Sequence, residues 1–258
     1  MIKSKYLQTA IKAARAAAVV LMKDFKKRHV KHFKTESDFS TEADIGAEKI
    51  ILKIINEKFP DHNIVTEESQ EIDNSSDYTW IIDPLDGTIN YATGIPYFCV
   101  SIAMAFKGKV MVGVVLNPHD KELFYAERDK GAYLNDKRIH VSKVSDITRS
   151  YIAGPIKVTE LIEPIMKVNK IGYRIFGSSE LDYANVACGR IDARLKPSSM
   201  KIWDFAAGCL LIEEAGGKIT DIEGDKWTLE SKQIIASNGK LHNKILDLIN
   251  PKKVLRLN

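Results

Sequence analysis

Two aspartates, Asp83 and Asp86, stand three residues apart in the stretch WIIDPLDGTIN (residues 80–90). The residues before Asp83 are apolar and β-prone, which predicts a buried strand that ends in two acids. Pro84 stiffens the exit from this strand, so both carboxylates can face one point, and the carbonyl group of Leu85 is a further oxygen donor between them. This spacing indicates a site for a cation.

The residues that follow the second aspartate suit an anion. Gly87 lets the backbone approach a ligand closely, and Thr88 offers a hydroxyl group. If a short helix begins here, its free N–H groups point at the anion. Cation ligands beside an anion site are what phosphoryl transfer requires. The alternative is a tight turn with capping aspartates, since Asp-Pro and Asp-Gly are common in turns.

Other acids stand where a predicted strand ends or a predicted helix begins. Glu67 and Glu68 follow NIVT, and Asp204 lies at the start of WDFAAG. Crowded carboxylates raise each other's pKa, so a cluster of them usually needs a cation. These oxygen donors suit Mg²⁺ or Mn²⁺ rather than zinc. Taken singly, the glutamates are typical of surface charge and WDFAAG is typical of a capped core helix, so it is the combination that favours a metal site.

The composition is ordinary for a globular protein. The 258 residues are 45% hydrophobic and 28% charged, with a net charge of +4. No apolar run approaches the roughly 20 residues that cross a bilayer, so we expect a cytoplasmic protein with no membrane partner. The basic cluster at residues 23–34 has no nucleic-acid-binding motif around it, so nucleic acid is not an expected partner.

The elements that must position these residues differ between the two halves of the chain. Residues 1–148 predict helices at 4–27 and after Ser40 or Thr41, followed by strands of an antiparallel sheet. In residues 149–258 strands and helices alternate, and the helices are predicted at 159–169, 179–189, 203–217 and 240–250. We expect a metal-binding half and a second half that completes the site, in one compact unit.

Three motifs occur in order along the chain: EES (residues 67–69), DPLDGTINY (83–91) and WDFAAGCLLIEEAGG (203–217). In this order they resemble the inositol monophosphatase family, whose superfamily includes fructose-1,6-bisphosphatases and 3′(2′),5′-bisphosphate nucleotidases. The resemblance implies an α+β fold, a layered α-β-α-β-α sandwich with an antiparallel-rich first sheet and a mixed second sheet. It also implies a magnesium-dependent, lithium-sensitive phosphatase that forms a homodimer.

The same resemblance assigns the metal ligands. It implies two or three Mg²⁺ ions, with Mn²⁺ as an alternative ion. They would be held by Glu67, Asp83, Leu85 (through its carbonyl group), Asp86 and Asp204.

The resemblance further assigns catalytic and substrate-binding residues. Thr88, paired with Asp44, would orient and deprotonate the water that attacks phosphorus, and Glu67 would be the third catalytic residue. Lys34 and Asp38 would lie on a loop near the metals. The substrate would contact Asp86, Gly87, Thr88, Gly177, Ser178, Ser179, Lys196 and Asp204. From the residues alone, Ser178 and Ser179 also fit the N-terminal cap of a helix.

One segment departs from the family pattern. Inositol monophosphatases usually have a glutamate shortly before the Trp-Asp motif, where it contacts an inositol hydroxyl. Here no acid stands between Asp192 and Asp204, and Lys196 or Pro197 falls near the expected position. A lysine there could meet a second phosphate, which makes fructose-1,6-bisphosphate a candidate substrate beside inositol-1-phosphate.

Four functions remain open. The first is a Mg²⁺-dependent phosphomonoesterase for a small polyol or sugar phosphate, foremost inositol-1-phosphate. The second is a fructose-1,6-bisphosphatase or an enzyme with both substrates, and a bisphosphate nucleotidase ranks lower. The third is a transcription-associated binding factor, because some bacterial members of the family bind the transcription machinery. The fourth, a magnesium-binding structural protein, is the weakest, since such a protein does not need every one of these ligands.

Overall fold

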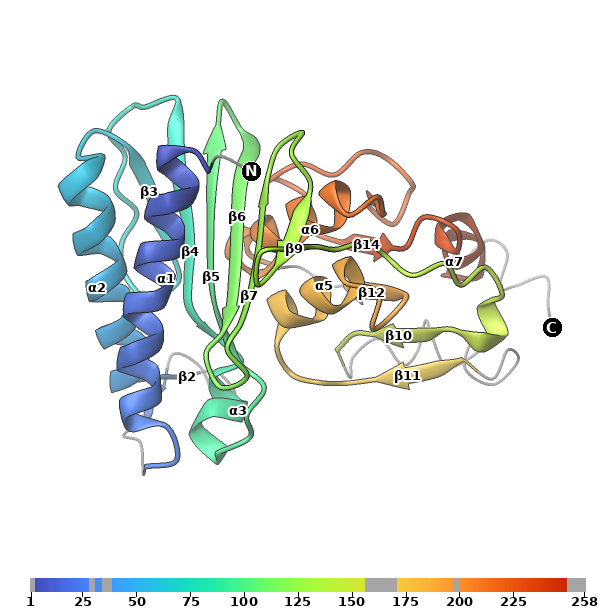
Figure 1. Cartoon of the computed structure of the whole chain (residues 1–258), viewed down its shortest axis with the longest axis horizontal. Helices are drawn as coiled ribbons and strands as arrows, with labels where there is room; N and C mark the ends of the chain where they lie inside the picture. Colours follow the sequence, from blue (N-terminus) through green and yellow to red (C-terminus); the bar gives the residue numbers. More distant parts are fainter. Residues whose placement is uncertain (1–2, 28–30, 34–38, 156–170, 197–199, 250–258) are drawn as a thin grey trace.

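The computed structural model describes residues 3–27, 31–33, 39–155, 171–196 and 200–249. Its elements form successive layers: helices, a seven-stranded sheet, helices, a five-stranded sheet and a last helix (Figure 1). Three separate hydrophobic cores fill the spaces between these layers. The predicted α+β sandwich is thereby confirmed. The helix predicted at residues 159–169 lies outside the described residues.

The seven-stranded sheet runs in the order β3-β4-β5-β6-β7-β8-β9. Its strands are β3 (Asn63–Thr66), β4 (Tyr78–Asp86), β5 (Cys99–Phe106), β6 (Lys109–Asn117), β7 (Glu122–Glu127), β8 (Ala132–Leu134) and β9 (Lys137–Arg138). Neighbouring strands from β4 to β9 are antiparallel, as predicted, but β3 and β4 are parallel. Parallel pairing is possible because residues 67–77 carry the chain back before β4 begins.

The antiparallel strands are joined by tight turns at the predicted places. Lys107 and Gly108 have φ values of 47° and 73°, and Asn135 and Asp136 have φ values of 46° and 65°. Two-residue turns with both φ values positive match the right-handed twist of the strands that they join. The Lys-Gly and Asn-Asp pairs in the sequence therefore predicted two hairpins correctly.

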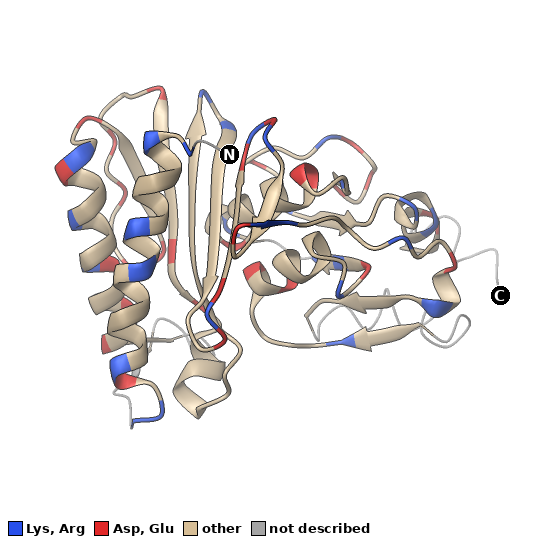
Figure 2. Cartoon of the chain, in the orientation of Figure 1, with Lys and Arg blue, Asp and Glu red and all other residues tan. Residues whose placement is uncertain are grey.

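Helices α1 (Lys5–Asp24) and α2 (Glu42–Lys58) cover one face of this sheet (Figure 1). Thr41 caps α2, because its hydroxyl accepts the N–H of Ala43 while the Asp44 carboxylate accepts the N–H of Thr41. Helix α1 ends before the predicted residue 27, since Lys26 has a φ of 68° that no helix continues. Figure 2 shows charges of both signs on these two helices and few on the central strands.

Alternation along β4 divides its side chains between two cores. Trp80 and Ile82 pack toward α1 and α2, whereas Ile81 packs toward the helices on the opposite face. The short strands β1 (Lys31–Phe33) and β2 (Phe39–Thr41) form a separate pair, and helix α3 (Thr88–Thr93) follows β4. Within the described ranges, none of the helices combines the length and the apolarity that a membrane span requires.

Helices α5 (Ser179–Ala187) and α6 (Ala206–Glu214) lie between the two sheets. The five-stranded sheet has the order β11-β10-β12-β14-β13. Its strands are β10 (Tyr151–Ala153), β11 (Gly172–Arg174), β12 (Ala193–Lys196), β13 (Lys218–Thr220) and β14 (Ile234–Ser237). Parallel pairs join β10 to β11 and β12, and antiparallel pairs join β14 to β12 and β13, so the second sheet is mixed, as predicted.

The helix predicted from Trp203 is interrupted. Residues Ile202–Asp204 form one 3-10 turn, and α6 begins only at Ala206, because Phe205 has an extended φ of −149°. Helix α6 then lies very close to the first sheet. A Cβ atom at Gly113 of β6 would stand 2.8 Å from the carbonyl oxygen of Ala207, so only glycine permits this approach.

Helix α7 (His242–Ile249) covers the outer face of the five-stranded sheet and begins with a buried histidine. The ring nitrogens of His242 lie 2.9 Å from the Thr220 hydroxyl and 2.9 Å from the Ser237 hydroxyl. Burial lowers the pKa of His242 to about 4, and the charge of Lys218 acts in the same direction. His242 therefore stays neutral in the folded protein.

This histidine predicts a pH dependence of stability. Below the ordinary histidine pKa of 6.5, the unfolded chain binds a proton that folded His242 does not accept until about pH 4. The contribution of His242 to the free energy of unfolding is therefore complete above pH 6.5 and decreases as the pH falls toward 4. In urea unfolding, the variant His242→Gln should show a shallower loss of stability over this range. The control His140→Gln, at an exposed position, should keep the wild-type slope.

Candidate metal and phosphate site

A β-bulge at the end of β4 decides how Asp83 and Asp86 point. Asp83 pairs with Ser101 and Asp86 pairs with Cys99, so β4 advances three residues while β5 advances two. Residues three apart in a regular strand point to opposite faces. The extra residue puts both aspartates on the face toward α5 and α6, and Pro84, which has no N–H to donate, lies inside the bulge.

Asp83 is buried among other acids. Its side chain accepts the backbone N–H of Leu85 at 2.9 Å. Burial raises the pKa of Asp83 well above its usual value, and the charges of Glu67, Asp86 and Asp204 raise it further. Asp86 is a neighbour in the same strand, whereas Glu67 and Asp204 come from distant parts of the sequence, and the fold brings all of them close enough to repel one another.

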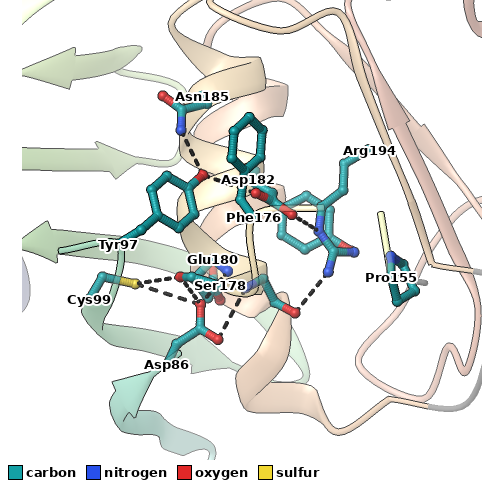
Figure 3. Close-up of polar contacts among 12 residues, drawn as sticks. Asp86, Tyr97, Cys99, Pro155, Phe176, Ser178, Glu180, Asp182, Asn185 and Arg194 are labelled. Carbon is teal, nitrogen blue, oxygen red and sulfur yellow. Dashed lines mark hydrogen bonds and ion pairs between the residues drawn. The ribbon is translucent and has the colours of Figure 1, made fainter. Parts of the chain in front are cut away.

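Asp86 joins the end of β4 to the start of α5 (Figure 3). Its Oδ2 atom accepts the Ser178 hydroxyl at 2.6 Å and the Glu180 N–H at 2.6 Å, and its Oδ1 atom accepts the Ser179 N–H at 3.1 Å. The N-terminus of a helix favours a nearby acid, so the first turn of α5 is a suitable partner for the Asp86 side chain. Oδ1 accepts one of these bonds and keeps a lone pair for a further ligand.

Thr88 and Asp44 meet as the sequence analysis expected. The Thr88 hydroxyl lies 3.2 Å from Oδ1 of Asp44 and 3.1 Å from the carbonyl oxygen of Leu85. The other oxygen of Asp44 accepts the N–H of Thr41 at 2.8 Å and its hydroxyl at 2.5 Å. Burial raises the pKa of Asp44 to about 6, against the bonds from Thr41, and the charge of Glu68 adds to the increase.

The two adjacent glutamates, Glu67 and Glu68, raise the pKa of different acids. The charge of Glu67 raises the pKa of Asp83, whereas that of Glu68 raises the pKa of Asp44. Just before them, Thr66 donates to the buried carboxylate of Glu48 at 2.6 Å, and the Glu68 N–H donates to the same oxygen at 3.3 Å. Glu48 thus fixes the backbone that carries both glutamates, a role that its position inside α2 did not reveal.

Asp204 closes the group from the 3-10 turn before α6. Its side chain accepts the N–H of Lys201 at 3.0 Å. Burial raises the pKa of Asp204, and the charge of Asp86 contributes, whereas the charges of Lys196 and Arg194 lower it. Lys196 is half-buried, and its charge lowers the pKa of Asp204, whereas its contact with a substrate stays a prediction.

Two glycines shape the edges of the site. Gly87 has a φ of 94°, and a Cβ atom there would lie 3.0 Å from the carbonyl oxygen of Tyr97. Gly177 has a φ of 86° and abuts the side chain of Asn90, which donates to the carbonyl oxygen of Phe176 at 2.7 Å. The short helix predicted after Gly87 is present as α3.

The arrangement of the acids leaves the ligand set as a proposal. Within the described ranges, no three Asp, Glu, His or Cys side chains are grouped so that they could hold a metal ion together. Both oxygens of Asp86 are instead engaged with α5. Three further residues considered in the sequence analysis lie outside the described residues: Lys34, Asp38 and Pro197.

Sequence reasoning missed charged residues of α5 and β12 that lie beside the site. Glu180 is fully buried and accepts the N–H of Gly208 at 2.7 Å, and burial raises the pKa of Glu180 to about 8. Asp182 and Arg194 are also buried. The signal for the helical pair was two acids in the first turn of a predicted helix, a pattern that the helix dipole commonly produces.

Similarity to known proteins now bears on this geometry. The model of the inositol monophosphatase family matches residues 2–253. The Nus factor SuhB of Pasteurella multocida is 39% identical, over 95% of this chain and 96% of that protein. Inositol monophosphatase 2 of Solanum lycopersicum is 34% identical, over 95% of this chain and 98% of that protein.

A solved structure supports the same relationship in three dimensions. The IMPase of Thermotoga maritima superimposes with a TM-score of 0.90 at 35% identity, covering 99% of this chain and 100% of that one. The family model, the sequence relatives and this structure agree over nearly the full length. The chain belongs to the inositol monophosphatase family.

Proposed function

We propose that the chain is a Mg²⁺-dependent phosphomonoesterase of a small polyol or sugar phosphate, with inositol-1-phosphate as the first candidate. Family membership supports a phosphatase, and one relative is named an inositol monophosphatase. The observation that carries the proposal is the acid group in which Glu67, Asp86 and Asp204 raise the pKa of the buried Asp83. Mutual repulsion of buried carboxylates costs free energy that a bound cation would offset.

The donor set fits Mg²⁺. Its side-chain members are carboxylates, and the carbonyl group of Leu85 adds a neutral oxygen, which is the ligand chemistry that hard divalent cations prefer. Glu67, Asp83, Asp86, Asp204 and the Leu85 carbonyl would hold the ions. When bound, Mg²⁺ supplies positive charge that polarises a phosphate ester and makes water a better nucleophile.

Thr88 and Asp44 supply the proton chemistry in this proposal. The Thr88 hydroxyl would accept a hydrogen bond from the attacking water while it donates to Oδ1 of Asp44, 3.2 Å away. With a pKa of about 6, Asp44 is ionised near neutral pH and still basic enough to draw a proton through Thr88. The backbone N–H groups of Gly87 and Thr88 would hold the phosphate oxygens.

The hydrogen bonds of Ser178 and Ser179 support a role other than contact with the substrate. The Ser178 hydroxyl is buried and donates to Asp86, and the Ser179 hydroxyl accepts a bond from Arg194. We propose that both serines position Asp86, while Gly177 and Lys196 remain candidate substrate contacts. A homodimer and sensitivity to lithium are likewise proposals that rest on the family.

A second candidate is a binding role in transcription, because the Pasteurella multocida relative is named a Nus factor. Because of this name, the expectation that nucleic acid is not a partner has no support. Binding assays with purified bacterial RNA polymerase and with RNA, using wild type and an Asp86→Asn variant that has lost activity, would separate this role from catalysis. Equal binding by both proteins would favour a binding role that does not use the metal site.

The first test is phosphate release from inositol-1-phosphate and fructose-1,6-bisphosphate with Mg²⁺, and with EDTA as the control. Asp86→Asn should lower kcat/KM by about 100-fold or more, because the site loses an anionic ligand at its centre. Asparagine keeps a carbonyl oxygen as an acceptor for α5, so circular dichroism should remain that of the wild type. Near-normal turnover by this variant would contradict the proposal.

The choice of substrate depends on Lys196 in this proposal. If its ammonium group anchors a second phosphate, Lys196→Glu should lower kcat/KM for fructose-1,6-bisphosphate by about tenfold and leave inositol-1-phosphate hydrolysis unimpaired. Lys196→Gln, which removes the charge without adding an acid, should give a smaller loss. Equal losses on both substrates would mean that Lys196 supports the site as a whole.

The repulsion among the acids predicts a stability effect that needs no turnover. In EDTA, Asp83→Asn should raise Tm by about 3 °C, because it removes one buried charge from the group and keeps an acceptor for the Leu85 N–H. Mg²⁺ should stabilise the wild type in differential scanning calorimetry but not this variant. The control Asp77→Asn, at an exposed acid beside β4, should behave as the wild type does. A lower Tm for Asp83→Asn in EDTA would contradict the proposal that the charges of these acids repel one another.

A further inference from the structure

A buried cation lies behind the proposed metal site. Arg194 of β12 is 3% exposed, and Figure 3 shows its guanidinium group pointing toward the start of α5. Its Nη2 atom donates to the Ser179 hydroxyl at 2.7 Å, and its Nη1 atom donates to the Tyr183 hydroxyl at 3.0 Å. The guanidinium carbon lies 4.4 Å from the centre of the Tyr183 ring. Such a buried arginine cannot touch a substrate, so its effect must pass through its neighbours.

A carboxylate of α5 also holds the Arg194 side chain. Its Nε atom lies 3.5 Å from Oδ2 of Asp182, and Oδ1 of Asp182 accepts the Tyr97 hydroxyl at 2.9 Å. Tyr97 in turn accepts a hydrogen bond from Asn185 at 3.0 Å and stacks on Phe176. Arg194 is therefore held by an ion pair and two hydrogen bonds, and all three partners belong to α5.

These contacts belong to a closed ring that includes Asp86, Arg194, Asp182 and Tyr97 (Figure 3). Ser179, which Arg194 holds by its hydroxyl, donates its N–H to Asp86, and Glu180 beside it does the same. Asp86 pairs with Cys99 on β5, two residues after Tyr97. The ring thus runs from Asp86 through Ser179, Arg194 and Asp182 to Tyr97, and returns along the chain to the strand that pairs with Asp86.

We propose that Arg194 is a positioning residue for Asp86. It holds the first turn of α5 through Ser179, and this turn fixes the direction of the Asp86 carboxylate. The consequence for Mg²⁺ rests on the proposed function, in which Asp86 is a ligand. The positioning of Asp86 itself does not depend on a metal.

The positive charge of Arg194, taken alone, would weaken the binding of a cation, whereas positioning of Asp86 would strengthen it. Its charge acts on Asp86 and Asp204, so it weakens the field that attracts Mg²⁺. If this charge were its main influence, a neutral residue at position 194 would increase Mg²⁺ affinity. If positioning dominates, every variant that breaks the bond to Ser179 decreases the affinity, including those that keep the charge.

Ser179→Ala and Arg194→Lys make this distinction, because both keep a cation and disturb the bond between Arg194 and Ser179. In isothermal titration of the purified protein with Mg²⁺, each should weaken binding by about tenfold. Their kcat should recover at saturating Mg²⁺, so the defect appears in the Mg²⁺ concentration required. Unchanged affinity in both variants, or tighter binding in Arg194→Gln, would overturn the proposal.

Arg128 provides a matched control for loss of stability. Its side chain is 12% exposed, donates to Glu213 at 2.5 Å and also bonds the Val110 carbonyl oxygen, away from α5. Arg128→Lys should lower Tm but leave Mg²⁺ affinity and activity unchanged. If its Mg²⁺ affinity falls in proportion to Tm, as it does in Arg194→Lys, the effect of Arg194 is general destabilisation and the proposal fails.

Amide hydrogen exchange without metal separates this proposal from the proposed function. The Glu180 N–H, which donates to Asp86, should exchange faster in Ser179→Ala and Arg194→Lys than in wild type or Arg128→Lys. Unchanged exchange would overturn the positioning role. If exchange accelerates as expected while Asp86→Asn leaves Mg²⁺ binding intact, the metal assignment of Asp86 fails and the positioning role of Arg194 stands.

Discussion

Burial of like charges at one point is the constraint on which the rest of the structure depends. Asp83 lies in the protein interior beside Asp86 of the same strand, and Glu67 and Asp204 approach it from two other segments. In a medium of low dielectric constant their repulsion is strong. Three of these acids are tied to a donor by the elements described above: Asp83 to Leu85, Asp86 to α5 and Asp204 to Lys201.

The layer of α5 and α6 between the sheets makes these ties possible. The glycine at position 113 brings α6 against β6, and Glu180 of α5 accepts the N–H of Gly208 of α6. The two helices are thus joined to each other and to both sheets. Because α5 begins beside the end of β4, its N-terminus faces Asp86 while its other side faces Arg194 of the second sheet. The site therefore depends on three layers together: the first sheet, the helices α5 and α6, and the second sheet.

Local patterns in the sequence predicted much of the fold. The cap at Thr41, the hairpin turns and the order of strands and helices follow from short-range chemistry, which does not depend on distant contacts. The convergence of the acids was also predictable, because carboxylates at the ends of buried strands are costly unless they share a cation. The parallel pairing of β3 with β4 and the break at Phe205 did not follow, since both depend on tertiary packing.

The ring of contacts through Asp86 and Arg194 could not be predicted from the sequence for a related reason. A helix between two sheets has no polar face, and nearly all of α5 is buried, including Glu180 and Asp182. Amphipathic patterns assign such charges to solvent. The alternation of IDARLKP likewise says that Arg194 and Leu195 face opposite sides of β12, but not that both sides are covered.

The bulge in β4 has a consequence for how this segment can vary. Side chains before the bulge are sorted between two cores, and those after it are sorted in the opposite phase, so Leu85 packs with α1 and α2 while Asp86 faces α5. Removal of one residue between the aspartates would remove the bulge and leave both carboxylates on one face, but the backbone between them would join the regular ladder with β5. The Leu85 carbonyl, which the Thr88 hydroxyl reaches at 3.1 Å, would then be drawn into that ladder and away from the site. The length of this stretch thus sets the place of a backbone oxygen that no side-chain substitution replaces.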